Sequence, residues 1–226
     1  MASVVDICNL ALAHLGDAAT IASIDPPEGS AQAEHCARFY PIARDNLLEM
    51  HNWNFSTRRA LLAEVTNDWV QWQHAYALPS DCVNPISVIS NEAYDDYATR
   101  FIPTDTPQFA HNYSPAISAG RYVPQPFTIE TLSSGIHVLY TNLENAVLRY
   151  QALVNDTTEF SALFVTTLSW HLASMLAGPV LKGDAGAAES KRCSQMMAGW
   201  LAEARKTDGN QRSIKVEHIV PWTSGR

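Results

Sequence analysis

Histidine and carboxylate side chains are the first residues to test for chemistry, because they serve as general acids, general bases and metal ligands. No histidine stands three or four residues from another, the spacing that would place two imidazoles on one helical face. His171 lies in an uncharged stretch, where we favour a core histidine bonded to a backbone or hydroxyl group over a general base. The eight histidines are His14, His35, His51, His74, His111, His137, His171 and His218.

The remaining polar residues give no metal-binding or nucleotide-binding pattern. Glu92, Asp95 and Asp96 form the one tight acidic group, which we interpret as a solvated turn, because a metal site needs carboxylates from several segments. No phosphate-binding loop, His-Glu-x-x-His, EF-hand or Gly-x-Ser-x-Gly motif occurs. We therefore expect no catalytic residue, no cofactor and no metal. The cysteines lack zinc-knuckle spacing and are interpreted as buried free thiols: Cys8, Cys36, Cys82 and Cys193.

Aromatic residues gather in two short segments. Trp53-Asn54-Phe55 precedes the basic pair Arg58-Arg59, which could stack on a ring or touch a phosphate. We favour surface charges beside a packed aromatic pair. Trp69, Trp72 and Tyr76 crowd a second segment, which we interpret as core or interface, since aromatic side chains dominate both.

The composition sets limits on the function. The chain has 226 residues, a formal net charge of -8, 46% hydrophobic residues and 17% charged residues. These values exclude a disordered or collagen-like chain, and the acidic balance argues against a broad phosphate-binding surface. The low charged fraction suggests that some uncharged surface is buried between subunits. We expect no secretory signal at the first residues, because no basic segment precedes the apolar run.

We expect helices at both ends of the chain to position the histidine and aromatic residues named above. Ser3 is a candidate N-cap for a helix over 3–15, with Asp6 three residues on and Gly16 after its end. Ser30 can cap a second helix that runs to about His51, with a kink or local break expected at Pro41.

Strand signals dominate the middle of the chain. A strand is expected over 83–89, and a hairpin over 127–140 turns through Ser133-Ser134-Gly135. A further strand over 146–153 places Arg149 and Gln151 on its wetter face. The proline-rich stretch 103–126 predicts a long irregular loop.

Two more helices and an arm complete the chain. Between Glu159 and Lys182 no charged residue occurs, yet the scattered polar groups favour a helix buried in a soluble protein over a membrane span. Asp156 is its candidate N-cap. The last helix carries an apolar stripe that we expect to be one packed face, and 207–226 reads as an extended arm. The stripe is Cys193, Met196, Met197, Trp200, Leu201 and Ala204.

Together these elements predict an α+β fold. N-terminal helices over 1–58 and C-terminal helices over 156–206 form a helical bundle, and a β-rich region over 59–155, with its loop 103–126, is inserted between them. The arm 207–226 is too short to form its own core.

Several motifs in the chain resemble those of one protein family. The run from Asn9 to Gly16 is similar to the first helix of the head-to-tail adaptors of short-tailed phages, the tail tubular protein A family. The similarity continues through Trp53-Asn54-Phe55, Arg58 to Leu62, and Tyr76 to Cys82, and it is best over 5–85 and 136–205. The order and spacing of these motifs together are more specific than any one motif alone.

The resemblance implies a structural virion protein without a catalytic site. Family members form a twelve-subunit ring that binds the portal and joins it to the tail nozzle protein around the DNA channel. DNA would then pass through the channel without sequence-specific binding, and no membrane would be a partner. The expected location is the tail or neck of the virion, and the host cytoplasm during assembly.

Two segments are the candidate contact sites. An alternating apolar arm gains stability by adding to another surface, so we expect docking on the portal or on a neighbouring subunit through Ile214, Val216, Ile219, Val220 and Trp222. The alternative is an arm folded back on its own subunit. We expect the long loop to contact the tail or a neighbour through Phe109, Tyr113 and Tyr122.

Two other functional classes stay open. One is a neck stopper or another minor virion interaction protein. The other, less favoured, is a cell-wall hydrolase with a dispersed site of carboxylates and histidine. Ring formation on an isolated portal would distinguish the adaptor from both.

Overall fold

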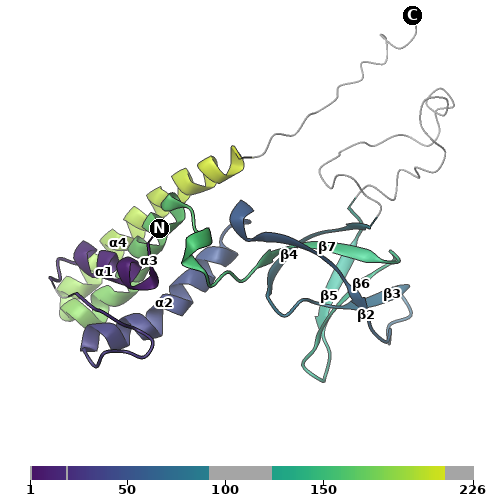
Figure 1. Cartoon of the computed structure of the whole chain (residues 1–226), viewed down its shortest axis with the longest axis horizontal. Coiled ribbons are helices and arrows are strands. Elements are labelled where there is room, and N and C mark those ends of the chain that lie inside the picture. Colours follow the sequence, from purple (N-terminus) through teal and green to yellow (C-terminus); the bar gives the residue numbers. More distant parts are fainter. Residues whose placement is uncertain (1, 19, 92–123, 212–226) are drawn as a thin grey trace, which may run out of the picture. The chain divides into compact units, whose positions relative to one another are not determined.

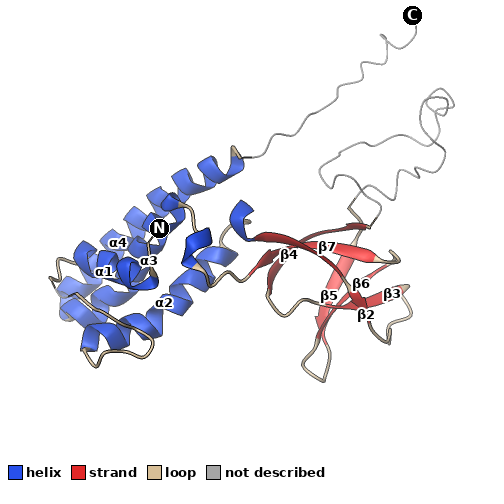
Figure 2. Ribbon diagram, viewed as in Figure 1, coloured by secondary structure: helices blue, strands red, loops and turns tan. Residues whose placement is uncertain are grey.

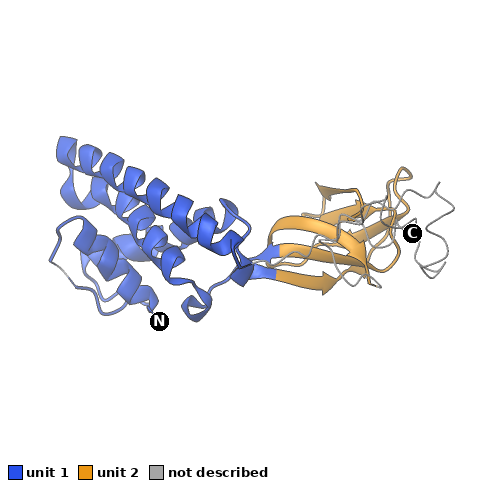
Figure 3. Cartoon of the chain, turned by 90° about the horizontal axis from the view of Figure 1, so that it is seen from above, with its two compact units in different colours: residues 1–57, 151–211 blue, residues 58–150, 212–226 orange. Residues whose placement is uncertain are grey.

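The computed structural model describes residues 2–18, 20–91 and 124–211. Within these residues the chain has four α-helices and two β-sheets, and the predicted α+β class is confirmed (Figures 1 and 2). The chain forms two compact units, shown in different colours in Figure 3. The first combines 1–57 with 151–211, and the second holds 58–150. The sequence predicts an insertion over 59–155, which ends later than the second unit does.

The first two helices begin where their capping residues predict. α1, Val4–His14, has a capping box in which Ser3 and Asp6 exchange side-chain and backbone hydrogen bonds. α2, Ala31–Glu49, starts after Ser30, whose hydroxyl accepts from the Ala33 N–H. The helix continues through Pro41, so the expected local break does not occur. The neighbouring Tyr40 and Ala43 are buried, and this packing holds the helix together around the missing N–H group.

The third helix starts later than predicted. Asp156 caps a short 3₁₀ turn, η4 (Thr157–Glu159), and not the helix itself. α3, Ala162–Leu181, is capped by Ser161, because the extended backbone at Phe160 separates the two elements. α3 packs against α1, α2 and α4 and supplies much of the core of the first unit.

The composition of α3 fits both a membrane-spanning helix and the core helix of a soluble protein. Among the described residues it is the one helix long and apolar enough to cross a membrane, and 56% of its most apolar window is buried. The core helix of a soluble protein meets the same criterion. Its packing against three other helices gives a sufficient reason for the uncharged sequence.

The fourth helix corrects two expectations. α4, Gly183–Gly209, extends past residue 206, so the chain is still helical where the arm was expected to begin at 207. Its apolar stripe is also covered only in part. Cys193 and Ala204 are buried, whereas Met196 and Trp200 remain 39% and 36% exposed. Among the described helices α4 packs mainly against α3, and this single packing partner does not bury the whole stripe.

The α3–α4 pair approaches very closely at one glycine. A Cβ built on Gly186 would lie 2.8 Å from the backbone oxygen of Ala177. The small residues at the start of α4 therefore permit close backbone contact.

The second unit contains most of the sheet structure. β2 (Ala63–Glu64), β3 (His74–Ala77), β6 (His137–Thr141) and β5 (Phe127–Thr131) form an antiparallel sheet in that order. The predicted hairpin is confirmed: β5 pairs with β6, Thr131 lies opposite His137, and Gly135 adopts a φ of 82°. The other sheet has the order β1 (Thr57–Leu61), β7 (Ala146–Ala152), β4 (Cys82–Ser90).

The prediction of a wetter face on β7 is wrong. Arg149 is 4% exposed and Gln151 is fully buried. β7 is the middle strand of its sheet, so both of its edges are paired and its side chains are enclosed more than the sequence pattern suggests.

Two glycines in the interior of α4, Gly186 and Gly199, provide a matched stability test. Gly186→Ala should destabilise the chain, because the new methyl group meets the Ala177 oxygen. Gly199→Ala should stabilise it by about 0.5–1 kcal/mol, because nothing lies within 4 Å of a Cβ there and alanine favours the helix. Urea unfolding of both variants measures the free energies. Equal effects of the two substitutions would contradict the close approach at Gly186.

Candidate functional site

The contact residues nominated from the sequence lie outside the described residues. This applies to the arm residues Ile214, Val216, Ile219, Val220 and Trp222 and to the loop residues Phe109, Tyr113 and Tyr122. The acidic group Glu92, Asp95 and Asp96, interpreted as a solvated turn, also lies outside the described residues. The candidate site in the described part of the chain is therefore built from other residues.

It centres on residues 50–57, which we call the anchor segment, between α2 and β1. Trp53 is fully buried, its indole N–H donates to the Leu47 carbonyl at 2.9 Å, and its ring meets Phe164 of α3 edge-on at 5.0 Å. Phe55 packs on Phe164 at the same centroid distance and on Phe160 at 5.7 Å. The two rings that the sequence interpreted as a packed pair thus fix the anchor segment onto α3.

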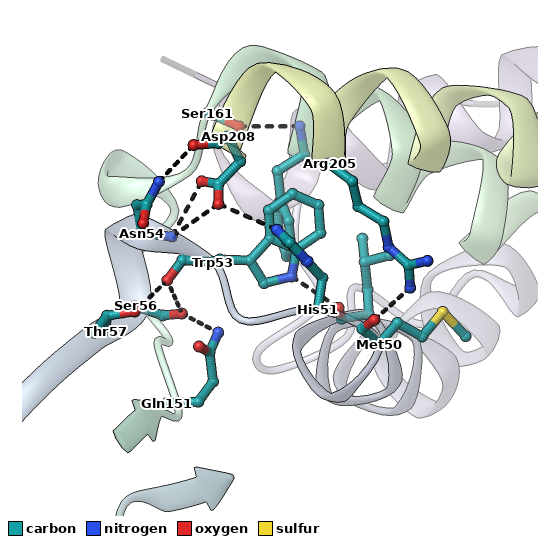
Figure 4. A network of polar contacts seen from close by, with 12 residues as sticks. Met50, His51, Trp53, Asn54, Ser56, Thr57, Gln151, Ser161, Arg205 and Asp208 are labelled. Carbon is teal, nitrogen blue, oxygen red and sulfur yellow. Dashed lines mark hydrogen bonds and ion pairs between the residues drawn. The ribbon is translucent and has the colours of Figure 1, made fainter. Parts of the chain in front are cut away.

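The polar side of the anchor segment is bonded to the end of α4 (Figure 4). The Asp208 carboxylate accepts the Asn54 backbone N–H at 3.0 Å and lies 3.1 Å from His51 Nε2. The Asn54 side-chain amide donates to the Asp208 carbonyl at 2.6 Å. Nearby, the Arg205 guanidinium donates to the Met50 carbonyl.

This arrangement runs against the local preference of the helix. A carboxylate in the last turn of α4 faces the negative end of the helix dipole, and Asp208 is only 8% exposed. Burying an acceptor of this kind is favourable only when donors satisfy it, and Asn54 and His51 supply them. Asp208 therefore stabilises the joint between α4 and the anchor segment rather than α4 itself.

A second group of bonds joins the two points where the chain leaves and re-enters the first unit. The hydroxyls of Ser56 and Thr57 both donate to the Trp53 carbonyl, at 3.3 and 2.8 Å. The side-chain amide of Gln151 donates to the Ser56 hydroxyl (Figure 4). The outgoing segment at 56–57 and the returning segment at 151 are thereby held together at the base of the insertion.

The site has one element of a catalytic arrangement. Asp208 and His51 form a carboxylate–imidazole pair, which in hydrolases orients a general base. Such a base needs a nucleophile within hydrogen-bond reach, and the hydroxyl of Ser56 is bonded instead to Trp53 and Gln151. Across the described ranges, no group of three or more histidines, cysteines or acids could hold a metal ion. The hydrogen bonds of Asp208, His51 and Ser56 hold separate chain segments together.

A further cluster joins α1, α3 and α4. The His14 and Trp170 rings stack at 3.6 Å, and the Arg192 guanidinium lies 5.4 Å from the Trp170 ring centroid. Arg192 also donates to the His14 carbonyl at 3.0 Å, and His14 Nε2 lies 3.0 Å from the Ser169 hydroxyl. Burial, and secondarily the charge of Arg192, lower the pKa of His14.

The core position of His171 is confirmed, but its expected hydrogen bond is not. The side chain is buried, and neither ring nitrogen has a hydrogen-bond partner among the described residues. Burial lowers the pKa of His171, because the charged imidazolium is poorly solvated there.

One pattern in the sequence indicates that Asp208 is buried. Leu201, Ala204 and Asp208 stand at i, i+3 and i+7, so the aspartate continues the buried face of α4. A polar residue in that register indicates a buried polar contact. No local signal identifies Asn54 or His51 as its partners, because 154 residues separate Asn54 from Asp208.

Comparison with known proteins adds no family assignment. No family model matches the chain, and no curated protein matches it.

Removing the Asp208 carboxylate should weaken the first unit. We expect Asp208→Ala to lower the free energy of unfolding by about 1–3 kcal/mol, because the partly buried Asn54 N–H loses its hydrogen bond to the carboxylate. Thr207→Ala, at an exposed position in the same turn, is the control and should change it by less than about 0.5 kcal/mol. Equal stabilities of the two variants in urea unfolding would show that the joint contributes nothing.

The two histidines with lowered pKa values predict a pH dependence. Folding favours their neutral form, so their stabilising contribution is complete above the ordinary pKa of about 6.5 and is lost as pH falls below it. His171→Leu removes one titrating group and should reduce the loss of unfolding free energy between about pH 7.5 and 5.5. The measurement is urea unfolding across this range. An unchanged slope in the variant would contradict the assignment.

Proposed function

We propose that the chain is a head-to-tail adaptor of a short-tailed phage. In this role several copies form a ring in the neck of the virion, most simply twelve, between the portal and the tail nozzle protein. The ring continues the DNA channel and acts as a structural element. The proposal rests first on the order and spacing of the motifs in the first helix, the anchor segment and the strand that follows.

One structural observation supports the proposal most. The first unit is assembled from both ends of the chain, and the sheet-rich unit is inserted between α2 and α3. The Trp53-Asn54-Phe55 motif lies where the chain leaves the helices. Its aromatic rings pack on α3, and the backbone and side chain of Asn54 are hydrogen-bonded to Asp208 of α4. A protein that bridges two different partners benefits from two separately folded units, each with its own surface.

The charge of the chain is compatible with a DNA channel. A formal net charge of -8 gives no general attraction for phosphate. An acidic channel wall would repel DNA and so prevent it from adhering during passage.

The test is binding to purified portals of the same phage, read by cryo-electron microscopy and by the copy number per portal. The full chain should form a closed ring. Truncation after Gln211 should abolish ring formation, because it removes the proposed docking residues 212–226 while keeping α4 and Asp208 intact.

Deletion of residues 108–120 is the matched control. It should preserve the portal ring and impair only the attachment of the tail. One or two copies per virion, or unchanged portal affinity after truncation at Gln211, would refute the adaptor ring or the docking role of the arm, respectively.

A further inference from the structure

α4 presents a second face that the other described elements leave mostly open, apart from Arg192, which contacts the His14 carbonyl and the Trp170 ring. Cys193, Leu201 and Ala204 are buried in the helical core, while a neighbouring row of side chains stays at least partly exposed. This row follows the heptad spacing i, i+3, i+7, i+10, i+14 and i+17 of helices that pair side by side. We call it the α4 seam: Glu189, Arg192, Met196, Gly199, Glu203 and Lys206.

The centre of the α4 seam is costly for the isolated chain. Met196 is 39% exposed, and Trp200, directly beside the seam, is 36% exposed. Gly199 weakens the middle of a long helix, yet nothing in the described chain lies within 4 Å of a Cβ at that position. Gly186, by contrast, is required by the nearby Ala177 backbone. Within the described residues, no element accounts for the glycine at 199 or for the exposed apolar groups around it.

We infer that the α4 seam of one copy binds the α4 seam of a second copy, with the two helices antiparallel about a two-fold axis. In this arrangement Met196 enters the gap at Gly199 of the second copy. Glu189 lies opposite Lys206 of the second copy, and Arg192 lies opposite its Glu203. The two-fold axis repeats each contact, so the seam is complementary to itself.

Charge sets the direction of the pairing. A parallel pair in register would place Glu203 against Glu203 and Arg192 against Arg192, which is repulsive. The antiparallel pair places opposite charges together at both ends. Within one helix Glu203 already lies 3.8 Å from Lys206, and Glu189 is paired with Arg192, so each end becomes a four-charge network. Exposed ion pairs contribute little affinity, so burial of Met196 and Trp200 supplies most of it.

The size of the seam indicates a reversible contact. From Glu189 to Lys206 the helix advances 17 residues, or about 26 Å at 1.5 Å per residue. A single helix pair of this length is at the small end of specific interfaces, so we expect a dissociation constant in the micromolar range. The inference concerns the free chain and does not depend on the adaptor proposal, since a two-fold pair cannot by itself build a head-to-tail ring.

Sedimentation equilibrium of the full chain, from about 1 to 300 μM, tests the pairing. The wild-type chain should show a monomer–dimer equilibrium. The double variant Glu203→Lys/Lys206→Glu keeps the net charge and the ion pair within the helix but places like charges together across the interface. We expect its dimerisation to weaken at least tenfold. The control Glu34→Lys/Arg38→Glu exchanges two exposed charges on α2 and should dimerise as the wild type does.

A second variant tests the centre of the seam. Gly199→Gln fills the space that Met196 of the second copy occupies, without a clash inside its own chain. It should weaken dimerisation while the thermal unfolding midpoint of the chain is retained or raised. A wild-type chain that is monomeric over the whole range, or an association that neither variant weakens, overturns the inference. Portal binding is measured separately, so its failure would bear on the adaptor proposal alone.

Discussion

The arrangement of the first unit depends on one buried carboxylate, that of Asp208, which requires hydrogen-bond donors. Asp208 stands at the end of α4, where neither the helix dipole nor the low exposure favours a negative charge. Among the described residues the anchor segment provides the donors, through the Asn54 N–H and His51. Because a misplaced anchor segment would leave the charge unpaired, this contact fixes how the chain leaves α2 and where α4 ends.

That constraint also explains how a sheet unit can be inserted into a helical unit. The anchor segment carries Trp53 and Phe55 into the core on one side and Asn54 to α4 on the other. The next residue, Ser56, bonds to the returning Gln151. The chain thus leaves and re-enters the first unit at one reinforced place, and the described residues that form the helical core all belong to that unit.

Features determined by neighbouring residues could be predicted from the sequence, and features determined by distant residues could not. The Ser3 and Ser30 caps and the hairpin at Gly135 follow from residues a few positions apart, and the structure contains them. The predicted cap at Asp156, the exposed side of β7 and the early end of α4 were wrong. At Gln151 and Asp208 in particular, tertiary contacts overrode the local pattern. The site was missed for the same reason, since its partners lie in segments far apart in the chain.

The described residues 2–18, 20–91 and 124–211 do not account for all the apolar residues of α4. A helix packed against a single neighbour needs an apolar face only as wide as that neighbour covers. α3 accounts for Cys193, Leu201 and Ala204, and it also accounts for Gly186 through the contact with Ala177. Met196, Gly199 and Trp200 lie beyond this face, and each costs the free chain helix stability or solvation. A face that is unfavourable in isolation and complementary in charge to itself is the pattern expected of a helix that completes its packing against another molecule.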